Sequence, residues 1–364
     1  MRIKAAVTQK AGAPFSIEDV ELEKPKPEEL LVKMKAVGVC HTDEAGRAGK
    51  LPFEFPVVLG HEGAGIVEAV GSAVSDFTPG DSVCLSFGTC GSCEHCLSGR
   101  PYACEIMFPL NFMGSMPDGT KRLSKNGKAI SSFFTQSSFA TYSVVNQRSA
   151  VKIDDDIDPG LAAPMGCGVQ TGAGCVLNVL KPELGSTIAV FGAGSVGLSA
   201  IMAANIAGCA RIIAVDKIPS RLALARELGA SDLIDGAKTQ DMAKELMALT
   251  SNRGLDYALD TSGSNFIADL ALNALSYTGT LMLAAGGTSL TLTTGAVLGA
   301  KTVLGVNEGN SIPKVFIPKL LSYYKRGRFP LEKLVSYYKF EEINEAFDAT
   351  LRGEVIKAVL RFDD

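Results

Sequence analysis

The stretch TIAVFGAGSVGLSAIMAANIAGC, residues 187–209, decides the fold class of this chain. An apolar, β-favouring segment runs directly into a glycine-rich turn, and an apolar segment of helical length follows the turn. Residues 188–210 carry no charge and are numerous enough to cross a membrane. The same run contains four glycines, two serines and an asparagine. A strand, a turn and a buried helix therefore account for it better than a lipid-facing helix.

The alternation of strand and helix continues beyond this stretch. Further strands are predicted at 211–216, 255–263 and 280–287, and helices at 220–230, 241–250 and 266–275. Such alternation predicts a parallel sheet covered on both faces. Upstream of about residue 161, short strands and turns dominate, as at 29–39 and 62–71. Near residue 301 the alternation ends, and predicted helices at 316–327 and 341–353 precede a last strand at 355–362. We therefore expect an α/β chain of two domains.

Residues 192–197 match the pattern G-x-G-x-x-G between a strand and a helix, which is typical of dinucleotide-binding turns. Gly192 permits the tight turn, Gly194 lets a pyrophosphate approach the helix N-terminus, and Gly197 allows close helix–strand packing. Asp216 ends the next predicted strand, 19 residues after Gly197. Its carboxylate can bond both adenosine ribose hydroxyls and repel a 2′-phosphate, so NAD is preferred over NADP. The alternative is a glycine-rich turn that binds nothing.

Composition excludes several classes of protein. The 364 residues include 35 basic and 39 acidic side chains, so no excess of positive charge favours a nucleic-acid partner. A hydrophobic fraction of 46% against 20% charged residues argues against disorder. The N-terminus lacks an apolar stretch of signal-peptide length, and the cysteine count is nine, an odd number. We therefore expect a cytoplasmic protein with no disulfide framework and no membrane partner.

Four of the nine cysteines fall on one short segment, as Cys90-x2-Cys93-x2-Cys96-x7-Cys104. Four thiolates at this spacing can close tetrahedrally on Zn²⁺ with no open position, which is typical of a structural site. A disulfide pair is the alternative. His95 lies next to Cys96, so its geometry as a replacement ligand is poor, and we expect it to be an exposed bystander.

Three further candidate ligands are separated in the sequence: Cys40 in GVCHTDE, His61 in LGHEGAG and Cys167 in MGCGVQTG. Together with the cysteine loop and residues 192–197, these motifs make the whole chain resemble the zinc-containing, medium-chain alcohol dehydrogenases. Segments 111–120, 133–142, 166–174 and 316–347 resemble the aryl-alcohol (benzyl alcohol) dehydrogenase branch in particular.

The resemblance implies a fold and two metal sites. The fold is a GroES-like, mainly-β catalytic domain (1–165 with 301–364) and a doubly wound, parallel Rossmann domain (166–300). The family's catalytic zinc ligands match Cys40, His61 and Cys167. With the structural cysteine loop, two Zn²⁺ ions per chain are implied.

The resemblance also implies roles for further residues. Thr42 matches the hydroxyl that bonds the substrate oxygen, Asp43 the carboxylate that orients His61, and Glu62 the carboxylate behind the metal. Cofactor contacts are implied for His41, Thr171, Val196 and Arg221. Many relatives carry a histidine at the end of a proton relay where this chain has Ala45, and Glu44 is a weak substitute.

The expected substrate is a benzylic or allylic primary alcohol. Pocket positions of the family fall on Ser86, Phe133 and Phe134, which would place a small group at one end and two aromatic rings at the other. Alternatively, the two phenylalanines belong to the core. Other functional hypotheses are an aliphatic alcohol or polyol dehydrogenase and, outside enzymes, an NAD-sensing or structural protein. The family favours a homodimer or homotetramer, with a pairing edge near 301–306.

Overall fold

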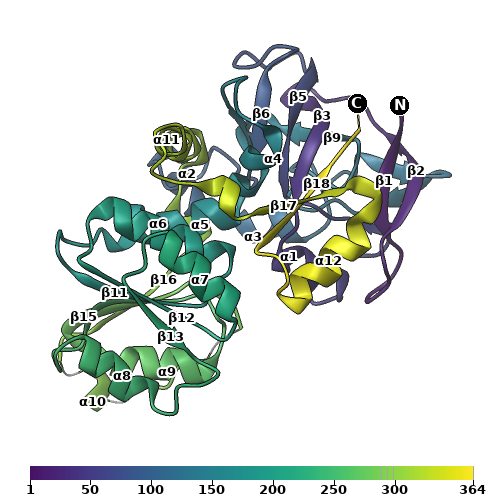
Figure 1. Ribbon diagram of the computed structural model, residues 1–364. Helices are drawn as coiled ribbons and strands as arrows, with labels where there is room; N and C mark the ends of the chain where they lie inside the picture. The colour runs from purple at the N-terminus through teal and green to yellow at the C-terminus, as the bar shows by residue number, and fades with distance from the viewer. Residues whose placement is uncertain (288, 293, 298, 364) are drawn as a thin grey trace. The chain divides into compact units, whose positions relative to one another are not determined.

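The structure is a computed structural model that describes residues 1–287, 289–292, 294–297 and 299–363. The chain divides into two compact units (Figure 1). The first unit comprises Met1–Gly168, Ile312–Leu321 and Leu331–Asp364, and therefore draws on both ends of the chain. The second unit comprises Val169–Ser311 and Ser322–Pro330.

The second unit is built on a parallel sheet in the order β13-β12-β11-β14-β15-β16. Numbered along the chain, this order is 3-2-1-4-5-6, which is that of a doubly wound dinucleotide-binding sheet. Figure 1 shows α6 and α7 on one face of the sheet and α8 and α9 on the other. The strands are β11 (Thr187–Phe191), β12 (Arg211–Asp216), β13 (Asp232–Asp235), β14 (Leu255–Asp260), β15 (Leu275–Leu283) and β16 (Thr302–Gly305). The helices are α5 (Gly168–Gly174), α6 (Ser195–Ala207), α7 (Pro219–Glu227), α8 (Met242–Leu249), α9 (Asn265–Asn273) and α10 (Thr294–Val297).

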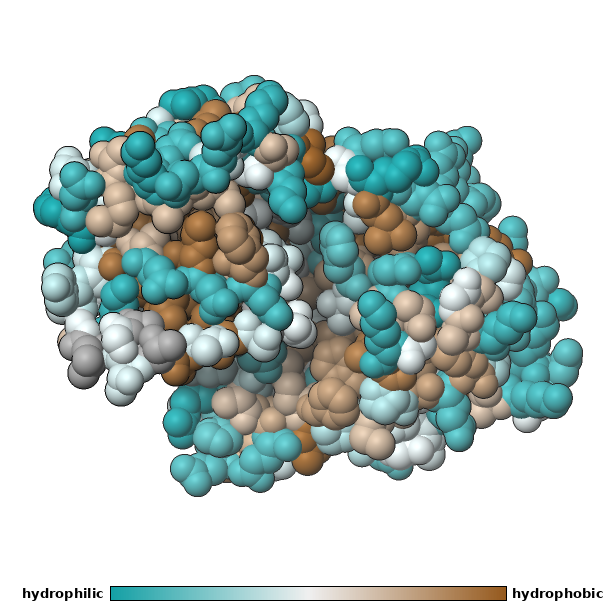
Figure 2. Space-filling model, turned by 90° about the horizontal axis from the view of Figure 1, so that it is seen from below, coloured by the Kyte–Doolittle hydropathy of each residue, from teal (hydrophilic) through white to brown (hydrophobic). Residues whose placement is uncertain are grey.

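The uncharged stretch 188–210 forms the central strand β11 and the buried helix α6, as predicted. Among the described residues, no helix combines the length and apolar character that a membrane crossing requires. The helix predicted to reach residue 275 ends at Asn273, because Leu275 pairs with Leu255 and begins β15. Figure 2 views the molecule from below and shows apolar residues, in brown, between hydrophilic ones, in teal. Phe266 and Leu292 are exposed apolar side chains of the second unit.

The first unit is mainly β. One sheet has the order β4-β1-β2-β7-β8; another has the order β10-β6-β5-β3-β18-β17, with β9 also on β3. Strand β18, at the C-terminal end of the chain, pairs antiparallel with β3 and so joins the N-terminal strands. The strands are β1 (Arg2–Thr8), β2 (Ser16–Leu22), β3 (Glu29–Gly38), β4 (Val57–Val58), β5 (Glu62–Val70), β6 (Ser82–Leu85), β7 (Leu123–Lys125), β8 (Lys128–Ile130), β9 (Tyr142–Asn146), β10 (Ala150–Lys152), β17 (Val335–Lys339) and β18 (Lys357–Arg361).

The helices between these strands are α1 (His41–Arg47), α2 (Glu94–Leu97), α3 (Met107–Phe112), α4 (Pro159–Ala162) and α12 (Ile343–Arg352). Helix α11 (Pro313–Lys325) begins in the first unit, and its residues from Ser322 onward belong to the second. The apolar residues of both sheets form one core, in which Val32, Val37 and Leu360 are fully buried. The predicted combination of a mainly-β GroES-like domain and a doubly wound Rossmann domain is confirmed.

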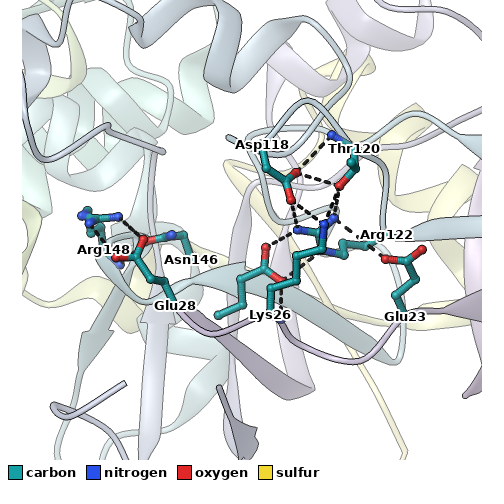
Figure 3. Close-up of polar contacts among 9 residues, drawn as sticks. Glu23, Lys26, Glu28, Asp118, Thr120, Arg122, Asn146 and Arg148 are labelled. Atoms are coloured by element: carbon teal, nitrogen blue, oxygen red, sulfur yellow. Dashed lines mark hydrogen bonds and ion pairs between the residues drawn. The ribbon is translucent and has the colours of Figure 1, made fainter. Parts of the chain in front are cut away.

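An ion-pair network centred on the buried Arg122 ties the segment before β3 to the loop before β7 (Figure 3). The Arg122 side chain is only 3% exposed, and its Nη2 lies 2.6 Å from Glu29 Oε1 and 3.0 Å from Asp118 Oδ2. Lys26 Nζ lies 2.6 Å from the same Asp118 oxygen. Burial disfavours the charged carboxylate, but the hydrogen bonds from Lys26, Thr120 and Arg122 outweigh it and hold the pKa of Asp118 well below its ordinary range. The network fixes the entry of the chain into β3, the strand that ends at the candidate site.

Candidate functional site

Two thiols and an imidazole from distant parts of the first unit meet at one point. The candidate ligand atoms of Cys40, His61, Glu62 and Cys167 all lie within 4.8 Å of one another. Strands β3 and β5 bring the first two together, because Gly38 pairs with Glu62 in an antiparallel register. Cys167 reaches the cluster because Gly166 packs tightly on β6, where a Cβ on Gly166 would lie 2.0 Å from the Leu85 carbonyl oxygen.

Asp43 holds two of these residues in place. Its Oδ1 accepts hydrogen bonds from His61 Nδ1 at 2.9 Å and from the Gly60 N–H at 3.0 Å. Its Oδ2 accepts a hydrogen bond from the Cys40 N–H at 3.1 Å, at the start of α1. Asp43 is fully buried, so these bonds replace the water that it loses. The carboxylate therefore fixes the imidazole ring and leaves Nε2 to face the cluster.

The chemistry of this donor set fits a zinc ion. His61 Nε2 is buried and has no hydrogen-bond partner among the described residues, as a nitrogen reserved for a metal requires. The hydrogen bond with the Cys167 sulfur is the largest influence on Cys40 and lowers the pKa of its thiol well below the ordinary value. Burial alone would lower the pKa of the His61 imidazole, but Asp43 and Cys40 raise it well above its ordinary value. The surroundings thus favour a positive charge, and Cys2His is a known catalytic zinc set.

Glu62 belongs to the same cluster but is bound to a lysine. Lys357 Nζ lies 2.9 Å from each oxygen of the Glu62 carboxylate and also donates to the Val39 carbonyl at 3.0 Å. Burial raises the pKa of Glu62 to about 7. Burial alone would lower the pKa of Lys357, but the charge of Glu62 raises it above the ordinary value. The sequence analysis missed Lys357, although a lysine within the apolar strand VIKAVLRF is a signal that could have found it.

Aromatic rings cover the imidazole of His61. The Phe134 ring stacks on it with 4.4 Å between ring centroids, and the Phe133 ring meets it edge-on at 5.5 Å. Phe112 of α3, which the sequence analysis missed, packs edge-on against Phe134 at 5.0 Å. Phe134 adopts a left-handed backbone with φ of 51°, which is costly for a bulky residue and is typical of functional segments. Ser86 is also fully buried, and its hydroxyl donates to the Gly166 carbonyl at 2.8 Å.

The four sulfurs of Cys90, Cys93, Cys96 and Cys104 also lie within 4.8 Å of one another. Burial disfavours the Cys90 thiolate, but backbone N–H groups of Ser92 and Cys93 donate to it and lower its pKa to about 6. All nine cysteines lie within the described residues and none of them forms a disulfide, so the loop contains no disulfide pair. His95 lies outside the cluster, but it is half-buried and not exposed as expected, because it sits in the α2 turn between two cysteines.

The glycine-rich turn of the second unit has the geometry that a dinucleotide requires. Gly192 has a φ of +94°, and a Cβ on Gly197 would lie 1.8 Å from the Gly192 carbonyl oxygen. A Cβ on Gly194 would meet open space, which is where a phosphate can approach. Asp216 lies beside this turn and accepts hydrogen bonds from the N–H groups of Ala193 at 2.6 Å and Ile218 at 2.9 Å. These observations fit a bound dinucleotide.

The remaining candidate residues lie on the same two units. In the second unit, Arg221 has a buried Nε without a partner among the described residues, Val196 is half-buried, and the Thr171 hydroxyl donates to Glu308 at 3.5 Å. In the first unit, Thr42 Oγ1 lies 3.7 Å from Cys40 Sγ and His41 is exposed. Glu44 bonds the guanidinium of Arg47 at 2.6 Å and 2.9 Å, so its carboxylate is engaged within α1.

The chain is similar to known proteins over its whole length. Residues 26–155 match the alcohol dehydrogenase GroES-like domain, and residues 195–322 match the zinc-binding dehydrogenase domain. The geraniol dehydrogenase of Castellaniella defragrans is 41% identical over 369 residues, which cover 99% of this chain and 97% of that protein. The crystal structure of benzyl alcohol dehydrogenase from Acinetobacter calcoaceticus has a TM-score of 0.95 at 41% identity, with both chains covered fully. An alcohol dehydrogenase zinc-binding domain protein from Burkholderia ambifaria has a TM-score of 0.97 at 42% identity, with the same coverage.

Proposed function

Since this chain belongs to the family of zinc-containing alcohol dehydrogenases, we propose that it oxidises benzylic or allylic primary alcohols to aldehydes with NAD. One observation carries the substrate class: the aromatic face of Phe134 stacks on the imidazole of the candidate ligand His61. Phe133 and Phe134 are buried in the core of the first unit, and the Phe134 ring lies directly against the candidate ligand, so aromatic side chains border the reacting centre. The relatives named above support the proposal, because geraniol is an allylic and benzyl alcohol a benzylic primary alcohol.

The reaction removes a hydride from the alcohol carbon and a proton from its hydroxyl, and gives the aldehyde, NADH and H⁺. Cys40, His61 and Cys167 would hold a zinc ion, which supplies Lewis-acid charge that favours ionisation of an alcohol. The second unit would hold NAD, which accepts the hydride. Thr42 lies on the first turn of α1 beside Cys40. Its Oγ1 would accept the proton of the alcohol hydroxyl while its own hydroxyl proton moves on toward solvent, so that it relays the proton and does not keep it. Asp43 keeps the imidazole of His61 oriented, and the buried rings exclude water from the site.

A panel of alcohols tests the substrate class. We expect kcat/KM with NAD⁺ to be higher for benzyl alcohol and geraniol than for ethanol or sorbitol, because the apolar aromatic surface rewards planar, unsaturated carbon next to the hydroxyl. The rise of NADH absorbance measures each rate. A preference for ethanol would support the aliphatic alternative, and a preference for sorbitol the polyol alternative. Absence of turnover with every alcohol, in a zinc-loaded protein that binds NAD, would support the non-enzymatic reading.

Replacing Asp216 by serine is expected to erase most of the preference for NAD over NADP. A 2′-phosphate would bring a charge of about −1.5 to −2 against the carboxylate. That repulsion is worth a few kcal/mol, or roughly 10²–10³-fold in kcat/KM. Arg221 stands on α7, shortly after Asp216, and its buried Nε has no partner among the described residues, so it could attract the new phosphate. The measurement is kcat/KM for both cofactors in both proteins.

Asp256→Ser provides the matched control. Asp256 also accepts a backbone N–H, that of Thr187 at 2.8 Å, but it stands at the opposite ends of the parallel strands. Its replacement should leave the cofactor ratio unchanged. If the wild-type protein already uses NADP as well as NAD, Asp216 does not govern the choice of cofactor.

The expected assembly is a homodimer or homotetramer acting on a small molecule in the cytoplasm. Strand β16 is an end strand of its sheet, and the neighbouring β15 exposes 82% of Tyr277. An end strand with an exposed aromatic residue beside it is a suitable pairing surface for a second copy. These features support a homo-oligomer, which sedimentation or light scattering would detect.

A further inference from the structure

The side chain of Gln136 joins the segment that carries His61 to the segment that carries Ser86. Gln136 lies on the loop between β8 and β9 and is only 2% exposed. Its Nε2 donates to the His61 carbonyl at 3.0 Å and to the Ser86 carbonyl at 3.1 Å. Two carbonyl acceptors on one nitrogen require the NH2 group, so the orientation of the amide is determined by its partners.

The loop between β8 and β9 donates hydrogen bonds to the carbonyls of three consecutive residues, the last of which is the candidate ligand His61. The N–H of Phe139 donates to Leu59 at 3.0 Å, the N–H of Ser138 donates to Gly60 at 2.9 Å, and the Gln136 amide donates to His61. Two of these bonds come from the backbone and any side chain could support them. Only the third depends on which side chain occupies position 136. That bond fixes the position of the main-chain carbonyl of His61, the candidate ligand itself.

A second set of bonds continues from Ser86 to the third candidate ligand. The Ser86 hydroxyl donates to the Gly166 carbonyl at 2.8 Å, and Cys167 follows Gly166 directly. The bonds from Gln136 through Ser86 therefore connect His61 to Cys167 without passing through the metal position. Asp43 connects His61 to Cys40 in the same way from the other side.

The loop itself is held in a strained form around Gln136. Phe134, Thr135 and Ser137 all have φ near 51°, in the left-handed region. Consecutive non-glycine residues adopt this region only where surrounding contacts impose it. Those contacts include Ser138 Oγ, which donates to Gln136 Oε1 at 2.5 Å, and Ser143 Oγ, which donates to the Gln136 carbonyl. This backbone conformation brings the Phe134 ring against the imidazole of His61 and the Gln136 amide against the His61 carbonyl at the same time.

We propose that Gln136 is a positioning residue that sets the geometry of the metal site by fixing the backbone of His61 relative to Ser86 and Cys167. The inference rests on the proposed function only in taking Cys40, His61 and Cys167 as metal ligands. It assigns no chemical step to Gln136, which acts through the residues it bonds. Removal of a group that hydrogen-bonds a metal-ligating residue typically lowers metal affinity by roughly 10–100-fold.

The test is metal binding by Gln136→Met, which keeps the length of the side chain and removes all three of its hydrogen bonds. The holoenzyme is challenged with a chelator, and the phase of zinc loss that is absent in Cys167→Ala identifies this site. We expect the Gln136→Met protein to lose zinc from this site at a roughly 10–100-fold lower chelator concentration than the wild type. After exchange with Co²⁺, the visible absorption of the site should also change, because it reports ligand geometry.

Two further variants make the result decisive. Thr350→Val removes a buried hydroxyl that donates to Ala346 at 2.8 Å within α12, and it should lower stability while leaving metal loss and the cobalt spectrum unchanged. Ser138→Ala frees one end of the Gln136 amide and should shift metal loss in the same direction by a smaller factor. If Gln136→Met does not fold, the metal loss of Ser138→Ala tests the proposal in its place.

Wild-type metal affinity and cobalt spectrum in a folded Gln136→Met protein would overturn the proposal, as would an unchanged Ser138→Ala protein if Gln136→Met does not fold. A wild-type chain that shows no metal-loss phase dependent on Cys167 would instead overturn the ligand assignment of the proposed function, and this inference with it.

Discussion

Replacing Cys167 by alanine is expected to abolish alcohol oxidation while leaving a folded protein that still binds NAD. The substitution removes one of three candidate ligands from a cluster whose other members stay in place through Asp43. A Lewis-acid ion contributes several kcal/mol to such a barrier, so the rate should fall by about a thousandfold or more. The measurements are steady-state turnover, zinc content per chain and NAD binding by fluorescence. We expect zinc content to fall from two ions to one.

Cys96→Ala is the matched control, since it makes the same change from thiol to methyl in the other cluster. Its four thiols lie on one segment with few buried residues of its own, so bound metal contributes directly to folding. We expect this protein to unfold at a lower temperature than Cys167→Ala. A wild type with a single zinc ion, or a Cys96→Ala protein as stable as the wild type, would contradict the assignment of two separate metal sites.

Thr42→Ala is expected to lower turnover by roughly 10²–10⁴-fold, the range typical of a lost general acid or base. In the structure, Thr42 Oγ1 lies 3.7 Å from Cys40 Sγ, next to the candidate metal ligands. Neighbouring Glu44 is bonded to Arg47 and is therefore a poor substitute as a proton acceptor. NAD binding and zinc content should both stay at wild-type levels. Rapid mixing under single-turnover conditions measures the chemical step apart from product release.

The conservative variant Thr42→Ser keeps the hydroxyl and should retain much of the rate. If Thr42→Ala turns over near the wild-type rate, the proton leaves by another path. A variant that loses zinc would show instead that the threonine supports Cys40 and has no role in proton transfer. The metal content of each variant therefore has to be measured beside its rate.

The fold could be predicted where the signal is local. A strand, a glycine turn and a helix lie next to one another in residues 187–209, and the central strand β11 and helix α6 follow from that stretch alone. The short strand β13 (Asp232–Asp235) was missed because four residues are too few for a periodic pattern. The pairing of β18 with β3 joins opposite ends of the chain. Only the family resemblance indicated that both ends build one domain.

The residues of the candidate site likewise fall into those that a local motif predicts and those that it does not. Cys40, His61 and Cys167 stand in glycine-flanked motifs, and the structure brings their ligand atoms together. The supporting residues Gln136 and Lys357 have no such motif, since their importance comes from carbonyls and a carboxylate that are distant in sequence. Their roles, like those of the predicted cofactor and pocket residues, are decided by tertiary contacts.

The spacing of the two candidate ligand sets has a consequence for the order in which the chain would acquire two zinc ions. Cys90 to Cys104 span a single short loop, so an ion can close it at small entropic cost as soon as that segment leaves the ribosome. Cys40 and Cys167 are held together only after β3, β5 and β6 have assembled. An ion at the cysteine loop would therefore act as a nucleus for a piece of nascent chain, and an ion at the other site would enter a domain that is already built. Zinc shortage late in synthesis would leave a chain that is folded but inactive.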